Sequence, residues 1–260
     1  MRRSWLPVAV FAVIVVVWEV LAQMDQSRVQ VIPAPSDILA AMIRTRETLL
    51  TRHIPETLLV TLIGMGIAIV TGLIIAALLD FSPALRQAIY PLLVISQTIP
   101  LIALATVLLL VFDFDLRPKV AVVVLFCFFP ITVSTLDGLA ATDPDVVALL
   151  RAMGASRWQV WRMARLPAAL PAFFSGLRIA ATYSVTGAIT GEYVASQYGL
   201  GQYLRQAYSS GRIDQAFAGI VIVAILSIAL VLIVSLIERL ALPWFFTQSR
   251  QASWNEPGIY

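Results

Sequence analysis

The chain has 260 residues, of which 60% are hydrophobic and only 13% are charged, and its mean hydropathy is +0.88. Soluble domains carry about 25% charged residues, so this composition excludes an ordinary soluble globular protein. The apolar residues form long uncharged runs, and roughly 20 such residues span a bilayer as a helix. Barrel strands would alternate polar and apolar residues, which these runs do not. We therefore expect an all-α membrane protein that forms a single domain over residues 1–260.

The formal net charge is +3, and all but one of the 18 basic residues are arginines. These basic residues are spread over loops and form no stripe with interleaved aromatic residues. We therefore expect contacts with membrane lipid headgroups and no nucleic-acid partner. Cys127 is the single cysteine, which excludes an intrachain disulfide. Because it lies in an apolar run, we interpret it as a packing residue.

Six apolar stretches predict transmembrane helices, at residues 5–22, 57–79, 88–112, 120–136, 173–194 and 216–237. The first stretch follows Arg2 and Arg3 and could be a secretory signal peptide. It is longer than the roughly 7–15 apolar residues typical of one, so we favour a retained helix. The two arginines then hold the N-terminus in the cytoplasm. With six spans, the tail 238–260 is cytoplasmic as well.

Residues 23–56 are too polar to span and are expected outside the membrane. Ser36 and Asp37 begin a segment with helical periodicity, which predicts an amphipathic helix lying along the membrane surface. His53 follows this helix and is interpreted as a solvated residue of an exposed loop. No second ligand stands at helical spacing from it, so we expect no metal site.

The remaining connections are a short turn at 80–87, another at 113–119, and an external loop at 195–215. The third span contains Pro91 and Pro100, and the fifth is the most polar. Arg178 and Glu192 lie near opposite ends of this fifth span, where we expect their long side chains to reach the two membrane interfaces.

Residues 143–167 form a basic stretch that could not lie within a bilayer and yet is patterned as two helices. Asp143 can cap the first helix, with Pro144 at its first position. Gly154 ends that helix, and Ser156 can cap a second one that runs to about Arg165. A structured basic hairpin between apolar spans predicts a docking surface for a partner in water. The alternative is a loop that only packs on headgroups.

The same stretch resembles the cytoplasmic signature of permease subunits of bacterial ABC importers that work with a solute-binding protein. That signature is a Glu-Ala-Ala triplet, then a glycine, then Ile-x-Leu-Pro. Gly154, Leu166 and Pro167 match it in register, whereas the triplet is replaced by residues 148–150, which begin with Ala148, and the isoleucine by Ala164. The acidic residue that family members often turn towards the ATPase is therefore missing, and Asp145 or Arg151 is a conjectured substitute.

Flanking strings, including GASRWQVWRMARLPAALP and GEYVAS, are similar to the nitrate, sulfonate and taurine branch of this family. Within that branch, YPLLVISQTIPLIAL and FCFFP resemble permeases for pyrimidine precursors of thiamine and for riboflavin, although Leu101 stands where those commonly have lysine. The resemblance implies a type I importer fold in the bacterial plasma membrane. It also implies transport of a pyrimidine or thiamine precursor, a riboflavin-like compound, or a sulfonate, taurine or nitrate.

The resemblance further implies an assembly of two permeases, a pair of ATPases and an extracytoplasmic binding protein, with a homodimer of this chain as the simplest permease pair. No Walker A loop is present, since Lys119 is the only lysine and lacks the glycine-rich context. ATP and magnesium are therefore expected on the partner, and no cofactor or catalytic residue on this chain. The residues expected to couple to the ATPase are Asp145, Ala148, Arg151, Gly154, Ala155, Ser156, Arg157, Trp158, Gln159, Leu166 and Pro167.

A solute pathway is predicted along polar faces of the third and fifth spans, where polar residues are costly against lipid. Such residues also serve as contacts between helices, and this alternative stays open. The candidates are Gln97, Thr98, Thr182, Ser184, Thr186, Thr190 and Glu192.

Two other classes of function fit the sequence less well. An intramembrane enzyme would need paired catalytic groups within the spans, which the sequence does not offer. A proton-coupled secondary transporter could use Arg178 and Glu192 and would need no ATPase, but the cytoplasmic signature argues against it.

Overall fold

The computed structural model describes residues 5–24, 32–112 and 115–245, and within these ranges the regular structure is entirely helical. The predicted all-α fold is confirmed. Two single π-helical turns, η1 and η2, accompany the α-helices. The elements are α1 (Trp5–Met24), α2 (Pro35–Thr48), η1 (Leu49–His53), α3 (Ile54–Phe81), α4 (Pro83–Ser96), α5 (Leu101–Phe112), α6 (Leu116–Ala140), α7 (Pro144–Ala152), α8 (Arg157–Val160), η2 (Trp161–Arg165), α9 (Leu166–Ala195), α10 (Leu200–Ser209) and α11 (Ile213–Ala241).

Four helical segments of the described chain are long and apolar enough to cross a membrane: α1, the continuous helix from α2 to α3, α6, and α11. A fifth candidate is the pair α4 and α5, which is bent by 96°. The third span was expected as one helix; it breaks after Ser96, where Pro100 restricts the preceding residue and lacks a backbone N–H. Helix α9 has 30 residues but is more polar than these. The number of six spans stays a prediction.

The expected amphipathic helix is present, but it is not a separate element. Helix α2 continues without a break through η1 into α3, so that Pro35–Phe81 is one helix of 47 residues. Pro55 lies in the first turn of α3. Its ring would clash with the carbonyl of Thr51 in a regular α-helix, and the wider π turn over Leu49–His53 precedes it. The helix therefore accommodates the proline instead of ending there.

The same arrangement recurs where the basic hairpin meets the fifth predicted span. The π turn η2 precedes Pro167, and α9 continues directly from it to Ala195. The second hairpin helix was expected to end near Arg165 and the span to begin at residue 173. Because Pro167 and Pro171 are both accommodated, the hairpin is instead joined to α9 without a break.

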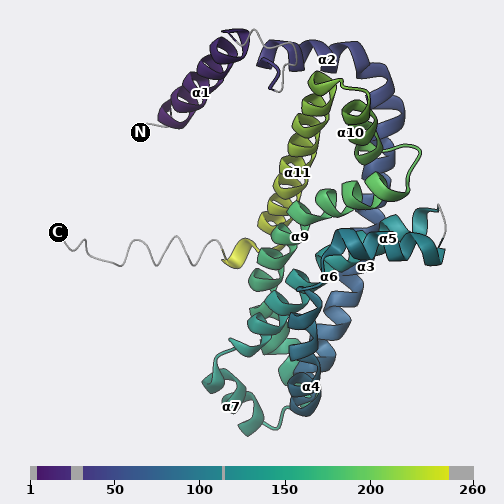
Figure 1. Ribbon diagram of the computed structural model, residues 1–260. Helices are drawn as coiled ribbons and strands as arrows, with labels where there is room; N and C mark the ends of the chain where they lie inside the picture. The colour runs from purple at the N-terminus through teal and green to yellow at the C-terminus, as the bar shows by residue number, and fades with distance from the viewer. Residues whose placement is uncertain (1–4, 25–31, 113–114, 246–260) are drawn as a thin grey trace.

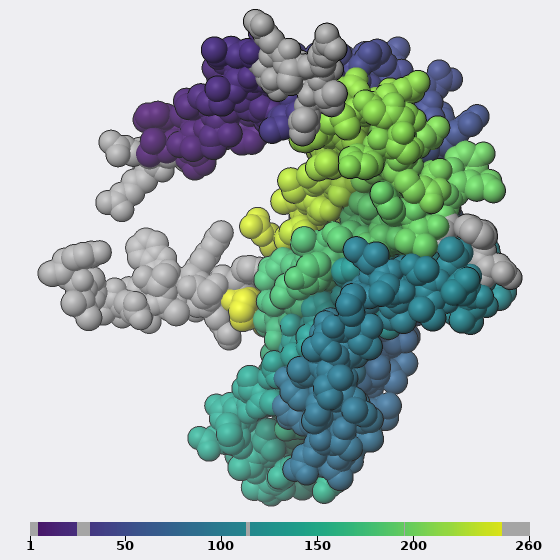
Figure 2. All heavy atoms as spheres, viewed as in Figure 1, coloured from purple at the N-terminus to yellow at the C-terminus, as the bar shows by residue number. Residues whose placement is uncertain are grey.

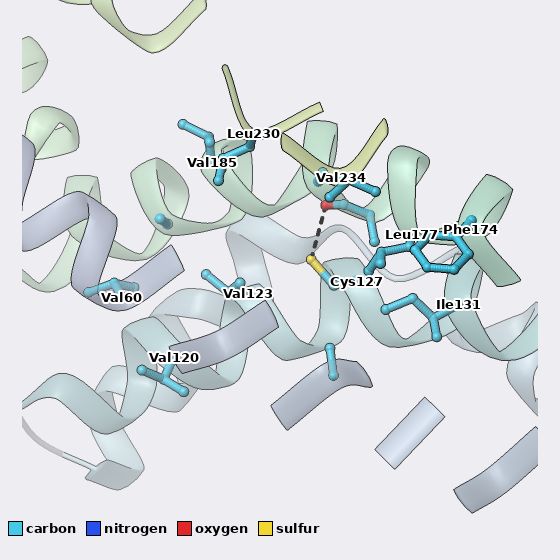
Figure 3. Close-up of a cluster of buried hydrophobic side chains, with 14 of the residues drawn as sticks. Val60, Val120, Val123, Cys127, Ile131, Phe174, Leu177, Val185, Leu230 and Val234 are labelled. Atoms are coloured by element: carbon cyan, nitrogen blue, oxygen red, sulfur yellow. Dashed lines mark hydrogen bonds between the residues drawn. The ribbon is translucent and has the colours of Figure 1, made fainter. Parts of the chain in front are cut away.

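The core lies among α3, α6, α9 and α11 and consists of small and branched side chains (Figure 3). Cys127 is fully buried there, and its Sγ donates a weak hydrogen bond to the carbonyl of Ala180 on α9 at 3.4 Å. The prediction that Cys127 is a packing residue is confirmed.

The helices form an elongated bundle with two different ends (Figure 1). The hairpin of α7 and α8 lies at one end beside α4, whereas α2 and α10 lie at the other. Helix α1 stands away from the bundle, and most of its side chains are exposed (Figures 1 and 2). Of the predicted tail 238–260, Glu238 to Ala241 belong to α11, and residues 246–260 lie outside the described ranges.

Candidate functional site

The hairpin of residues 143–167 is built by the local signals that the sequence carries. The side chain of Asp143 accepts a hydrogen bond from the backbone N–H of Asp145 at 2.8 Å, with Pro144 in the first turn of α7. Such a cap satisfies one of the backbone donors that a helix start leaves free. The predicted start of the hairpin is confirmed.

The turn between the two short helices also follows the prediction. Gly154 adopts φ +84°, a conformation that glycine reaches at little cost. Ser156 and Gln159 form a capping box: the Gln159 N–H donates to Ser156 Oγ at 3.3 Å, and the Ser156 N–H donates to Gln159 Oε1 at 2.7 Å. These reciprocal bonds fix the direction in which α8 leaves the turn.

The hairpin presents apolar side chains to its surroundings, and α7 has no buried residue. Leu149, Met153 and Trp158 are exposed by 62%, 75% and 57%. A surface of this kind marks a contact site more often than a solvated loop. Of the predicted coupling residues, Ala155 and Leu166 are partly buried, and the others are exposed: Asp145, Ala148, Arg151, Gly154, Ser156, Arg157, Trp158, Gln159 and Pro167.

Aromatic stacking and an ion pair attach the hairpin to the end of α3. Trp158 stacks on Trp161 at 5.1 Å between ring centroids, and Phe81 lies 5.6 Å from Trp161. Arg165 Nη1 donates to both carboxylate oxygens of Asp80 at 2.7 Å. Sequence reasoning missed Asp80 and Phe81, which it placed at a simple turn. Their only signal is a charged residue next to an aromatic one at the end of an uncharged span.

The threonines of the fifth predicted span lie on one face of α9. Thr182 and Thr186 are exposed and Thr190 is partly buried. The hydroxyl of Thr182 donates to the carbonyl of Arg178 at 3.2 Å, and that of Thr190 to the carbonyl of Thr186 at 2.8 Å. These two bonds stay within α9, so within the described chain they do not connect helices. Gln97 and Thr98 are also exposed, at the bend between α4 and α5.

Ser184 and Glu192 were predicted on the same path, but both are fully buried on the other side of α9. Ser184 donates to the carbonyl of Ala181. Glu192 Oε2 accepts hydrogen bonds from Thr57 Oγ1 and from the N–H of Gly201, each at 2.9 Å. Glu192 thus ties α9 to the starts of α3 and α10.

The expectation that the Glu192 side chain reaches a membrane interface was wrong, and Arg178 has a partner within the described chain. Glu192 is buried in the network just described, and Arg178 forms an ion pair with the buried Glu238 of α11. Inside a membrane protein, a charge is stabilised by a specific partner as effectively as by reaching the interface.

His53 was expected to be solvated, and this expectation was wrong. Its side chain is only 6% exposed, and Nδ1 lies 2.8 Å from the carbonyl of Gly199. The ring packs against Tyr203, whose hydroxyl shares a hydrogen bond with Thr45 at 3.1 Å. Burial raises the pKa of Tyr203 above its usual value, so the hydroxyl stays protonated.

Lys119 completes this end of the bundle. Its Nζ donates to Glu56 Oε1 at 2.6 Å and to Ser196 Oγ at 3.3 Å, which joins α6 to the start of α3 and the end of α9. Across the described ranges, histidine, cysteine and acidic side chains form no group that could hold a metal ion.

Comparison with known proteins identifies the family of this chain and solved structures with a similar fold. Residues 68–246 match the family described as binding-protein-dependent transport system inner membrane component. The formylaminopyrimidine transport permease protein ThiX of Halalkalibacterium halodurans is 38% identical over 94% of this chain and 98% of its own. The riboflavin transport system permease protein RibX of Chloroflexus aurantiacus is 34% identical over 62% and 60%. The inward-facing MetNI methionine ABC transporter has a similar fold, with a TM-score of 0.65 and 24% identity over 74% of this chain and 95% of that one.

Proposed function

This chain belongs to the family of binding-protein-dependent transport system inner membrane components and is the permease subunit of an ABC importer, and we propose that its α7–α8 hairpin receives the ATPase that drives import. The observation that carries the proposal is the exposed apolar surface of a hairpin that is nevertheless held rigidly. Leu149, Met153 and Trp158 face outward, while the Arg165–Asp80 pair fixes the base of the hairpin to α3.

The proposed mechanism transmits force along a continuous helix. Helix α8 passes through η2 into α9 without a loop, so a push on Trp158 or Arg157 displaces α9 as a lever. The closing of an ATPase pair on two such hairpins would tilt the attached spans between inward- and outward-open states. In this proposed mechanism, the hairpin and both termini lie in the cytoplasm, and the partner ATPase binds ATP and magnesium.

The solute pathway in this proposal follows the exposed stripe of α9 and lies between two copies of the chain. Thr182 and Thr186 would be costly against lipid, and within this chain their face is uncovered. A second copy that brings its own stripe opposite would enclose a polar path. An extracytoplasmic binding protein would deliver solute at the end formed by α2 and α10. Gln97 and Thr98 belong to the path in this proposal, whereas Ser184 and Glu192 support it from behind.

The substrate class that we propose is a flat heteroaromatic compound, such as a pyrimidine precursor of thiamine or a riboflavin-like molecule. Relatives named for formylaminopyrimidine and riboflavin support this choice. Tyr183 and Tyr193 support it independently, because both are exposed on α9 beside the threonine stripe. Tyrosine rings stack on flat aromatic rings and also offer a hydroxyl group for hydrogen bonding. A small inorganic anion has no ring on which they could stack.

Site-directed cross-linking tests the docking. In a Cys127→Ser background, Ser156→Cys is expected to form adducts with the purified ATPase subunit, in amounts that change with nucleotide. Ser210→Cys is the matched control, since Ser210 is an exposed serine at the opposite end of the bundle, and it should give none. Absence of adducts from Ser156→Cys in every nucleotide state would overturn the proposal.

A further inference from the structure

A cavity of about 250 Å³ lies between the hairpin and the corner where α3 meets α4. It shares Arg151 and Arg157 with the predicted coupling residues, whereas the apolar contact residues Leu149, Met153 and Trp158 lie outside its lining. Its lining combines basic, aromatic and apolar side chains with one acidic residue. The lining residues are Asp80, Phe81, Pro83, Arg151, Arg157, Val160, Trp161 and Arg165.

The walls of this cavity offer hydrogen-bond donors and almost no free acceptor. Both oxygens of Asp80, the single acidic residue, are already bound by Arg165. Neither Arg151 nor Arg157 forms an ion pair with any residue that the structure describes. The three arginines therefore outweigh one carboxylate, and the cavity is electropositive.

Two donors at the cavity are buried and unpaired. The Nε of Arg165 and the indole Nε1 of Trp161 are shielded from solvent and have no hydrogen-bond partner in the described chain. Buried polar groups nearly always have a partner, and those that lack one call for an explanation. Both atoms lie behind the lining, out of reach of a ligand in the cavity, so the case for an anion rests on the exposed guanidinium groups of Arg151 and Arg157.

The position of the cavity indicates which anion it meets. It lies where α3 ends at Phe81 and where η2 leads into α9, at the boundary between apolar spans and the polar hairpin. The rings of Phe81 and Trp161, 5.6 Å apart between centroids, line it, and tryptophan gathers at the headgroup level of membranes. Basic pockets at that level bind phosphate headgroups.

We propose that this cavity binds a phosphate group, supplied by the headgroup of an anionic phospholipid or by free phosphate. Guanidinium groups match the geometry of phosphate oxygens with paired N–H donors, and Arg151 and Arg157 supply these pairs. A bound headgroup would hold the base of the hairpin at the membrane surface.

Native mass spectrometry of the purified full chain tests the proposal without any ATPase, so its outcome is independent of the docking experiment. We expect one phosphatidylglycerol molecule to be retained in preference to phosphatidylcholine with the same acyl chains. The double variant Arg151→Gln, Arg157→Gln should bind it roughly 30-fold more weakly. Arg162→Gln is the matched control, because Arg162 is an exposed arginine of the same hairpin that does not line the cavity; it should bind as the parent does.

Titration with inorganic phosphate separates the two sources. If phosphate displaces phosphatidylglycerol only at high concentration, the lipid headgroup is the ligand. If phosphate binds the parent but not the double variant, and phosphatidylglycerol is retained no better than phosphatidylcholine, free phosphate is the ligand. Equal retention of both lipids together with no phosphate binding would overturn the proposal. So would a double variant that keeps its lipid and fails only in contact with the ATPase, since the arginines would then serve an acidic side chain of that partner.

Discussion

The two ends of the bundle differ in whether their polar side chains have partners within the described chain. At the end near α10, the buried polar groups bond to one another across four helices: His53 lies on the carbonyl of Gly199, Glu192 accepts from Thr57, and Lys119 donates to Glu56. At the hairpin end, Arg151 and Arg157 are exposed and form no ion pair with the described residues.

This difference separates structural from functional polarity. A buried group whose partners all belong to the same chain stabilises that chain, because removing one partner leaves another unsatisfied. Exposed groups without a partner add little to stability and remain available for contacts outside the chain. Substitutions at the first end should therefore act on folding, and substitutions at the second should act on assembly and transport.

Removing the Glu192 carboxylate should have the largest effect on stability. In Glu192→Ala, the buried Thr57 hydroxyl and the Gly201 N–H lose their acceptor. We expect the free energy of unfolding to fall by about 3 kcal/mol. Thermal or denaturant unfolding in detergent measures this loss.

Glu192→Gln is the control for that substitution. Both hydrogen bonds end on Oε2, while Oε1 has no partner in the described chain. A glutamine can place its carbonyl at the Oε2 position and keep both bonds, so we expect a loss below about 1 kcal/mol. Equal losses in the two variants would show that the hydrogen bonds are not what Glu192 contributes.

Asp80→Ala tests the one strong tie at the hairpin end, and its effect should be smaller. The carboxylate is 6% exposed and binds Arg165, and an alanine leaves that arginine without its acceptor. We expect a loss of about 2 kcal/mol in the free energy of unfolding, together with slower ATP-driven uptake because the hairpin base is loosened.

Arg117→Ala provides the comparison for Asp80→Ala, because Asp115 itself caps α6 by accepting from the Leu116 N–H at 2.7 Å. Asp115 faces Arg117 at 3.6 Å with both side chains largely exposed, and such pairs contribute little. The free energy of unfolding should not change measurably. If both alanine variants lose the same stability, burial is not what distinguishes the two ion pairs.

The parts that the sequence predicted well are those in which cause and effect lie a few residues apart. Asp143, Gly154 and Ser156 act on their own helix ends, so the hairpin could be read from local pattern alone. The threonine stripe is similar, since Thr182, Thr186 and Thr190 recur at helical spacing. The same periodicity could have excluded Ser184, which is two residues from Thr182 and therefore points to another side of the helix.

The failures concern side chains whose partners are distant in sequence. Glu192 meets Thr57 from 135 positions away, and His53 meets Gly199 from 146. Local sequence does not indicate a partner so far away. Both residues were therefore predicted near solvent, because their side chains are polar. The helix boundaries were wrong as well: breaks were expected near His53 and after Arg165, whereas the π turns before Pro55 and Pro167 let each helix continue.

Two glycines with a left-handed backbone give the cleanest comparison between the two ends. Gly154 and Gly211 have φ of +84° and +70°, and a Cβ at either position would meet no atom within 4 Å. Alanine at each should therefore cost only the conformational strain of a left-handed backbone, about 1 kcal/mol, with matched losses in unfolding measurements.

Function should separate these two glycine variants although stability does not. Gly154 lies in the turn that we assign to the ATPase, and a Cβ there enters open space that the docked ATPase would occupy. Gly154→Ala should therefore lower ATP-driven uptake in liposomes several-fold, whereas Gly211→Ala should leave uptake near the parent level. Equal uptake by the two variants at equal loss of stability would mean that the turn at Gly154 carries no force, and the division of the molecule into a structural end and a coupling end would then be wrong.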